Sequence, residues 1–289
     1  LPSAPLHVLL YKFLNWEEFM PKFAHLPLIL KPDGNGKLSK RDGDRLGFPV
    51  FPLEWIDPKT NDVSSGYREK DYFPEAFVNM LAFLGWNPGN EKEVYSIEEL
   101  ISDFSLERVG KSGAKFDPEK AKWFNQQHLR LKSNSELAIL MKQNCSYDVS
   151  EVYLEKVAEL MKERATFQSE LISEKYFFDS VEDYDEKTFR KKWKSDSLSL
   201  VNEFFGLLNN IENFSALSIE SSFKKFIEEK EIGMGAILPN LRLILTGKGM
   251  GPSLFEIAAL LGKEEAMKRF NEKSTFFQNM FIKKQNESH

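Results

Sequence analysis

The sequence has little of what a metal centre, a disulfide framework or a membrane span requires. Its one cysteine, Cys145, excludes an intramolecular disulfide and any zinc site built from several thiolates. The four histidines, His7, His25, His128 and His289, lack the spacing of metal ligands, so we expect no protein-bound metal. The apolar runs are far shorter than the roughly 20 residues that cross a bilayer, and no charged-then-apolar leader precedes them. We therefore expect a soluble cytoplasmic protein without a membrane partner.

An excess of positive charge is also missing. The chain has 39 Lys and Arg against 44 Asp and Glu, a net charge of −5, which argues against a nonspecific nucleic-acid binder that relies on clustered cations. The distribution is uneven, because residues 1–50 carry seven basic and five acidic side chains whereas residues 51–100 carry four and ten. Local concentrations of basic residues in a chain that is acidic overall predict a partner that docks at a few defined positions.

The composition favours a large, mainly helical core. The 289 residues are 42% hydrophobic and 13% aromatic, enough for roughly two domains. Pro74 and Gly85 suit the start and end of one helix, and Ser96 with Glu99 forms the capping box of another over 96–104. Apolar spacing predicts further helices over 117–130, 135–143, 150–163, 167–176, 186–192, 196–209 and 217–230, and Ser253 with Glu256 predicts one more helix start.

One stretch departs from the helical pattern. Residues 47–66, GFPVFPLEWIDPKTNDVSSG, combine Val, Phe and Trp with Pro, Asn and Asp, a mixture typical of strands joined by a turn. We therefore expect a short hairpin in this segment.

A basic, Gly-rich loop lies over residues 30–44, LKPDGNGKLSKRDGD. Lysine is a mobile point charge that suits a polyphosphate, and glycine lets backbone N–H groups approach it. The preceding run HLPLIL predicts a strand that leads into the loop, as beside nucleotide pockets of α/β folds. The alternative is a solvated basic turn. In either case we expect Asp42 and Asp44 to moderate the charge of the loop and to bind no metal.

Several segments in order resemble class I glutamyl-tRNA synthetases of the bacterial type. LPSAPLHVLLYKFLNW and FAHLPLILKPDGNGKLSKRDGD resemble the second half of the catalytic domain, with KLSKR as the KMSKS-type signature. GYREKDYFPEAFVNMLAFLGW and KFDPEKAKWFNQQHLR resemble the stem-contact region, and KERATF and LRLILTGKGMGPSLFEIAALLGKE the anticodon-binding domain. The resemblance implies a mainly α chain: the end of a Rossmann-like α/β catalytic domain over 1–46, a helical stem-contact region over 47–134, and an all-α anticodon-binding domain over 135–289. Residues 47–66 are then an insertion, either a structural flap or an RNA contact.

The resemblance also implies site residues and partners. In the family the signature lysines stabilise the triphosphate of ATP, bound with Mg²⁺, as pyrophosphate leaves, and those roles fall on Lys37 and Lys40. The implied ATP contacts are Ile29, Leu30, Lys37, Ser39, Lys40 and Arg41, and the implied tRNA contacts at the anticodon are Arg164, Arg242, Pro252 and Leu254. The implied partners are tRNA(Glu), glutamate and ATP, and we expect a monomer. A surface ion pair with Glu159 or Glu163 is the alternative for Arg164, and core burial is the alternative for Leu254.

Two features depart from a complete enzyme of that family. The chain opens without a methionine, within an apolar pattern of helical spacing, and the His-x-Gly-His type motif of the family is absent from it. We expect a C-terminal portion of the ligase that does not form glutamyl-adenylate alone. The alternatives are a helical RNA- or protein-interaction module with a non-catalytic synthetase loop, and an independent phosphate-handling enzyme, which lacks a general base next to the loop. Whether the parent also charges tRNA for glutamine stays open.

Overall fold

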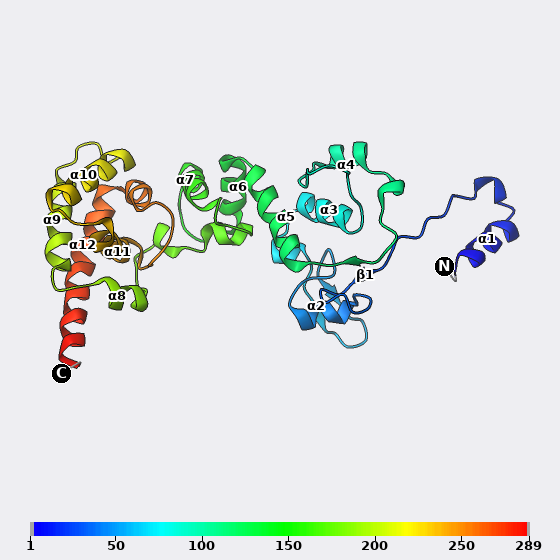
Figure 1. Ribbon diagram of the computed structural model, residues 1–289, viewed down its shortest axis with the longest axis horizontal. Coiled ribbons are helices and arrows are strands. Elements are labelled where there is room, and N and C mark those ends of the chain that lie inside the picture. The colour runs from blue at the N-terminus through cyan, green and yellow to red at the C-terminus, as the bar shows by residue number, and fades with distance from the viewer. Residues whose placement is uncertain (1–2, 288–289) are drawn as a thin grey trace. The chain divides into compact units, whose positions relative to one another are not determined.

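The chain folds as two compact units, residues 1–128 and residues 129–289, each described here by itself. The structure, a computed structural model, describes residues 3–287 without the side chains of Lys40, Arg41, Asp44, Lys284 and Glu287. Helices dominate both units, and every strand in the described range is two residues long (Figure 1). The prediction of a mainly helical chain is confirmed.

The first unit combines short helices with two small sheets. Strand β1 pairs in parallel with β4, and β2 pairs antiparallel with β3. In order, its elements are α1 (Ala4–Phe13), η1 (Glu17–Phe19), β1 (Ile29–Leu30), α2 (Lys40–Leu46), β2 (Trp55–Ile56), β3 (Val63–Ser64), η2 (Arg68–Lys70), α3 (Pro74–Phe83), α4 (Ile97–Asp103), η3 (Leu106–Arg108), β4 (Ala114–Lys115) and most of α5 (Pro118–Leu131).

Local sequence signals set the ends of α3 and α4. Pro74 occupies the first turn of α3, where its missing N–H costs no hydrogen bond, and Gly85 takes a positive φ of +107° just after the helix. At α4 the Glu99 N–H donates to the Ser96 hydroxyl over 3.2 Å and the Ser96 N–H donates to the Glu99 carboxylate over 2.9 Å. Both predicted helix starts are confirmed.

Buried asparagines tie α3 to its surroundings. The Asn79 amide donates to the Glu93 carbonyl over 3.0 Å and its oxygen accepts from the Tyr95 N–H over 2.9 Å, so the 93–95 segment is fixed on the helix. The Asn125 side-chain oxygen accepts from the Phe73 N–H over 2.8 Å, at the N-cap of α3. Backbone groups that would be orphaned by burial are thereby satisfied.

Residues 47–66 form the predicted hairpin. Strand β2 pairs with β3 in the register Trp55 to Ser64 and Ile56 to Val63. A Cβ placed on Gly66 would lie 2.2 Å from the backbone of Leu53, so the chain packs on itself here as only glycine allows. The segment is therefore an ordered part of the first unit.

The second unit is all helical in its described range, and phenylalanine supplies much of its core. Phe204, Phe205 and Phe223 are each 2% exposed or less, and the ring of Phe205 stacks on Phe270 with centroids 4.1 Å apart. Helix α6 packs on α7, while α9, α10 and α11 pack on α12 (Figure 1). The elements are α6 (Asn134–Asn144), α7 (Glu151–Met161), η4 (Gln168–Ile172), η5 (Lys175–Phe177), α8 (Glu186–Lys192), α9 (Ser197–Asn209), α10 (Ala216–Glu229), α11 (Met234–Thr246) and α12 (Leu254–Glu287).

The helix predicted over 167–176 is wrong. The segment forms two 3₁₀ turns, η4 and η5, whose hydrogen bonds span three residues, as from the Ser173 N–H to the Glu170 carbonyl. The Glu170 carboxylate accepts from the Thr166 N–H over 2.7 Å and so closes the first turn. Leu171, Tyr176 and Phe177 all point into the core from this short stretch, which one continuous α-helix would not arrange.

Helix α12 consists of two helices joined at a kink. Gly262 has φ 82° and ψ 162°, outside the helical region. At the start, the Glu256 N–H donates to the Ser253 hydroxyl over 3.5 Å, as predicted for this cap. The two halves of α12 therefore point in different directions from one glycine.

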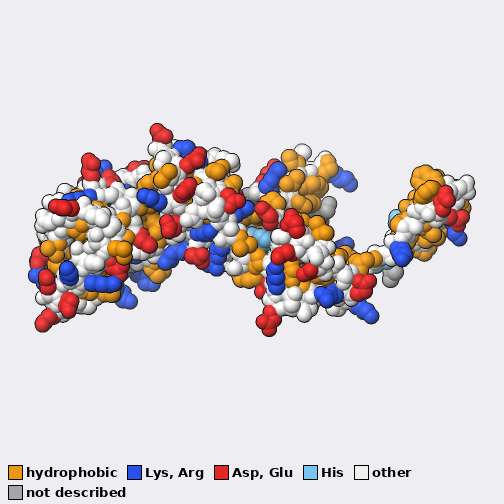
Figure 2. All heavy atoms as spheres, turned by 90° about the horizontal axis from the view of Figure 1, so that it is seen from above, with side chains coloured by type: hydrophobic (Ala, Val, Ile, Leu, Met, Phe, Trp, Pro, Cys, Tyr) orange, Lys and Arg blue, Asp and Glu red, His pale blue; other side chains and the backbone are white. Residues whose placement is uncertain are grey.

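Helix α1 and the segment after it are rich in exposed hydrophobic side chains. Leu6, Phe13 and Phe19 are 66%, 78% and 71% exposed, and no described residue of α1 is buried. Figure 2 shows hydrophobic side chains gathered over this N-terminal segment, with a few acidic and basic side chains among them. Among the described residues, no helix has the length and apolar character needed to span a membrane.

Candidate functional site

The basic loop is a tight reversal that begins at β1. The Leu38 N–H donates to the Ile29 carbonyl over 2.8 Å and the Lys31 N–H to the Gly36 carbonyl over 3.0 Å, which closes the loop at its base. Gly34 and Gly36 adopt φ of +80° and +86°, a conformation that favours glycine. The strand predicted from HLPLIL is confirmed for Ile29 and Leu30 alone.

Asp42 holds the loop against the helix that follows it. Its carboxylate, on a residue 7% exposed, accepts from the Ser39 N–H over 3.0 Å and from the Ser39 hydroxyl over 2.5 Å. Lys31 Nζ lies 3.3 Å and Arg45 Nη2 3.1 Å from the same group. The bonds from Ser39, with those from Arg45 and Lys31, hold the pKa of Asp42 well below its usual range. Asp42 therefore balances the charge of the loop and fixes its shape.

The predicted ATP contacts differ in exposure. The Lys37 side chain is exposed and has no carboxylate at ion-pair distance among the described side chains, so its ammonium group is available to an anion. Ser39 is exposed but engaged with Asp42, Ile29 is 37% exposed, and Leu30 is half-buried. The predicted contacts Lys40 and Arg41 lie at the start of α2, and their side chains lie outside the described residues.

We expect Asp42→Asn to loosen this loop. The neutral amide no longer attracts Lys31 or Arg45, so amide hydrogen exchange over residues 31–46 becomes faster. Asp33→Asn is the matched control, because Asp33 is exposed and its side-chain oxygen accepts from the Asn35 N–H within the same loop. Because the pKa of Asp42 is depressed, the wild-type protection, corrected for intrinsic exchange, persists from neutral pH down past about pH 4 and is lost in stronger acid. Equal exchange in the two variants would contradict the role of Asp42.

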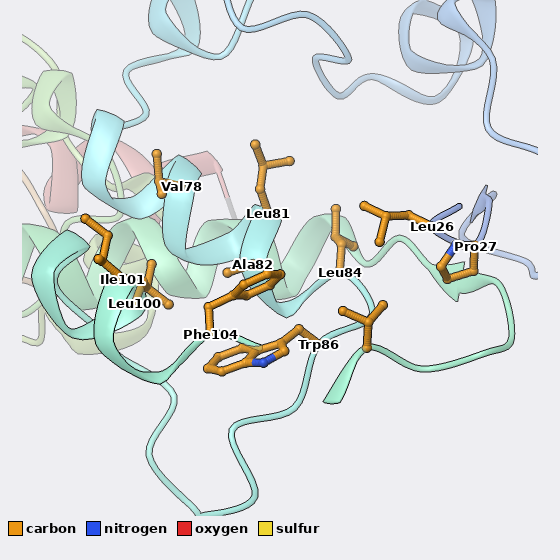
Figure 3. A pocket seen from close by; sticks show the side chains of 11 residues that line it. Leu26, Pro27, Val78, Leu81, Ala82, Leu84, Trp86, Leu100, Ile101 and Phe104 are labelled. Carbon is orange, nitrogen blue, oxygen red and sulfur yellow. The ribbon is translucent and has the colours of Figure 1, made fainter. Parts of the chain in front are cut away.

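The apolar cavity between α3 and α4 is unsuited to phosphate chemistry. It measures about 460 Å³ and, apart from the indole N–H of Trp86, its lining side chains carry no polar group (Figure 3). It is lined by Leu26, Pro27, Val78, Leu81, Ala82, Leu84, Trp86, Leu100, Ile101, Phe104 and Val109. A cavity of this kind offers nothing to neutralise an anion.

A second, polar cavity lies in the helical second unit. It measures about 450 Å³, and its lining includes Arg164, Glu174, Met250 and Pro252. Arg164 is exposed in the turn that follows α7, and no carboxylate lies at ion-pair distance from it among the described side chains. Glu163 instead pairs with Arg130 over 3.1 Å. The ion pair considered as the alternative role for Arg164 is therefore not formed.

Arg242 lies beside this cavity, and only one of its two terminal guanidinium nitrogens is hydrogen-bonded within the described protein. Its Nη2 donates to the Pro252 carbonyl over 2.8 Å, while its buried Nη1 has no hydrogen-bond partner among the described residues. Burial lowers the pKa of Arg242, and the nearby charge of Arg164 acts in the same direction. A Cβ on Gly251 would lie 3.0 Å from Nη1 and 3.6 Å from the Tyr176 hydroxyl, so these three residues meet at one point.

The other two predicted tRNA contacts are less accessible. Pro252 is buried, and Leu254 is 4% exposed and packs in the core of the unit, as its alternative proposed. By contrast, Met250 is 86% exposed at the tip of the loop. Sequence reasoning missed Met250 and Tyr176, although glycines on both sides of Met250 in KGMGP signal an exposed loop tip.

Comparisons with known proteins agree on the family. The family model "Anticodon binding domain" matches residues 123–273, more than half of the chain, and "tRNA synthetases class I (E and Q), catalytic domain" matches residues 1–123. The glutamate–tRNA ligase of Parabacteroides distasonis is 55% identical over 273 residues, and that of Porphyromonas gingivalis strain W83 is 51% identical. The chain belongs to the glutamyl-tRNA synthetase family. The resemblance stated from the sequence is thus confirmed.

Solved structures of glutamyl-tRNA synthetases share the fold. A glutamate tRNA ligase from Elizabethkingia meningosepticum, in complex with its amino acid, matches with a TM-score of 0.86 and 45% identity over 95% of this chain. The glutamate-tRNA synthetase of Elizabethkingia anophelis matches with a TM-score of 0.82. The alignments to the two ligases include 93% of this chain but 54% of each ligase. The alignments to the two solved structures include 55% of each solved chain. It therefore spans about half the length of the glutamyl-tRNA synthetases it matches.

Proposed function

We propose that this chain is the part of a glutamate–tRNA ligase that holds the ATP phosphates and binds tRNA(Glu). In this proposal residues 1–46 end the catalytic domain, residues 47–134 contact the tRNA stem, and residues 135–289 bind the anticodon. ATP, accompanied by Mg²⁺, and glutamate are the other substrates, and the protein acts as a monomer in the cytoplasm. The family match and the geometry of the two polar sites support this assignment.

The basic loop over residues 30–44, called the signature loop from here on because it contains KLSKR, contributes electrostatic stabilisation in this proposal. Negative charge grows on pyrophosphate as it leaves ATP, and a cation placed there stabilises the transition state more than the ground state. Lys37 is exposed and has no carboxylate at ion-pair distance among the side chains that the structure describes, so its ammonium group is able to follow the phosphates. Lys40 joins it from the start of α2, and Asp42 keeps the base of the loop closed. Ile29 and Leu30 would lie next to the adenine, and Ser39 and Arg41 next to the phosphates.

The Nη1 atom of Arg242, which has no hydrogen-bond partner among the described residues, carries the anticodon proposal. A buried N–H group without an acceptor costs about 1–3 kcal/mol, and an RNA base edge or phosphate would supply the acceptor once the neighbouring Gly251 moves aside and uncovers Nη1. Arg164 adds a second guanidinium that has no carboxylate partner among the described side chains, and Met250 adds an exposed apolar surface on which a base can stack. Pro252 and Leu254 then act by shaping the loop and its following helix.

Binding of the chain to RNA hairpins tests this function. The probes are the anticodon stem-loop of tRNA(Glu) and versions with one anticodon base changed, each measured at several salt concentrations. We expect the cognate hairpin to bind more tightly by about 1–3 kcal/mol per changed base, with a modest salt slope because few cations contact the phosphates. Equal affinity for all hairpins, or no binding, would instead favour the helical interaction module with a non-catalytic loop.

A further inference from the structure

A buried arginine links three segments of the second unit. Arg269 in α12 is 3% exposed. Its Nη1 donates to the carbonyls of Tyr176 and Leu245 over 2.8 and 2.7 Å, and its Nη2 donates to the Asp179 carbonyl over 2.9 Å. Its Nε donates to the Glu265 carboxylate over 2.8 Å, one helical turn away. All three nitrogens of the guanidinium are thus bonded.

These bonds satisfy carbonyl groups that no regular helix bond reaches. Leu245 lies in the last turn of α11, where carbonyls lack an intrahelical partner, and Tyr176 and Asp179 lie in and just after η5. A buried cation is costly unless its hydrogen bonds are complete, and a bonded buried arginine fixes the geometry of its acceptors. Arg269 therefore sets the spacing between η5, α11 and α12.

The two segments that Arg269 joins to α12, η5 and α11, carry Tyr176 and Arg242, which meet near Gly251 beside the polar cavity. Tyr176 presents its hydroxyl toward Gly251 and Arg242, and Arg242 precedes Leu245 by one turn of α11. We propose that Arg269, which is set back from the cavity, is a positioning residue that holds the RNA-reading guanidinium of Arg242 in place. This inference rests on the proposed function, because it assigns Arg269 a part in anticodon discrimination and not only in folding.

Substitution of Arg269 tests the inference. In the 289-residue chain, Arg269→Lys replaces a planar group with five donors by one ammonium group that cannot bond all four acceptors. We expect the ratio of affinities for the cognate and base-changed hairpins to fall by about threefold to thirtyfold, because Arg242 is less well fixed. Lys268→Gln is the control, since Lys268 is exposed on the same helix and lies 3.7 Å from the same Glu265. It should leave the ratio unchanged.

The outcomes separate the inference from the function. If the wild-type chain does not distinguish the hairpins, the proposed function fails. If it does, and Arg269→Lys distinguishes them equally well, the inference is overturned. Circular dichroism at the assay temperature reports the folded fraction, and loss of folded protein alone would lower total binding without changing the ratio. Should Arg269→Lys not fold, Glu265→Ala removes the one side-chain acceptor of Arg269 among the described residues and must reduce the ratio, or the inference is again overturned.

Discussion

Replacing Arg242 by alanine weakens binding of the cognate anticodon hairpin by about 1–3 kcal/mol, a loss of roughly fivefold to 150-fold. The substitution removes the Nη1 donor that has no partner within the described protein, and with it the Nη2 bond that holds the Pro252 carbonyl. Affinity is measured by filter binding at fixed salt with the wild-type chain alongside.

Two comparisons isolate the effect of Arg242. Arg190→Ala removes one positive charge from the exposed surface of α8 in the same unit, and it should change affinity little. Arg164→Ala should also weaken binding and, in addition, reduce discrimination at the third anticodon base, because guanidinium groups read base edges by directed hydrogen bonds. If Arg242→Ala binds both the cognate and the changed hairpins with the affinities of the wild-type chain, this surface does not contact the RNA.

Lys40→Ala should slow adenylate formation at least about tenfold, as expected for a contact made mainly in the transition state. The reaction is followed as a single turnover in a form of the ligase that catalyses ATP–pyrophosphate exchange, and tRNA affinity should change little. Lys37→Ala should have the same effect to a smaller extent. Lys59→Ala, at the exposed tip of the 47–66 hairpin, is the control that removes a lysine away from the signature. An unchanged single-turnover rate in Lys40→Ala would indicate that the loop is a solvated turn.

Local signals in the sequence predicted the helix starts well. Ser96 with Glu99 and Pro74 act within one helical turn, so their sequence spacing determines the bonds that they form. The segment over 167–176 failed for the opposite reason. Apolar spacing indicates which side chains face inward, but it does not separate α from 3₁₀ hydrogen bonding, which here depends on the Glu170 carboxylate and on where Tyr176 must point.

The candidate site residues could be predicted only where they belong to a recognisable sequence motif. KLSKR and LTGKGMGP identified the two loops, but no pattern in the sequence indicated that Arg242 donates to the Pro252 carbonyl or that Asp42 connects Lys31 with Ser39. Arg269 was missed altogether, because a charged residue in a helical pattern is normally solvent-facing. Its acceptors Tyr176 and Leu245 are far away in the sequence and meet it only in the folded chain.

The hairpin after the signature loop has a practical consequence for probing this protein. Its turn closes on itself: the Asn61 N–H donates to the Asp57 carbonyl, the Lys59 N–H to the Asp57 carboxylate, and the Thr60 hydroxyl to the Asp62 carboxylate. Exposed tips with small or polar residues are the sites where proteins best accept inserted sequence. An epitope or a fluorophore attached between Lys59 and Thr60 would thus label the first unit while leaving the bonds around Asp42 and the signature lysines intact.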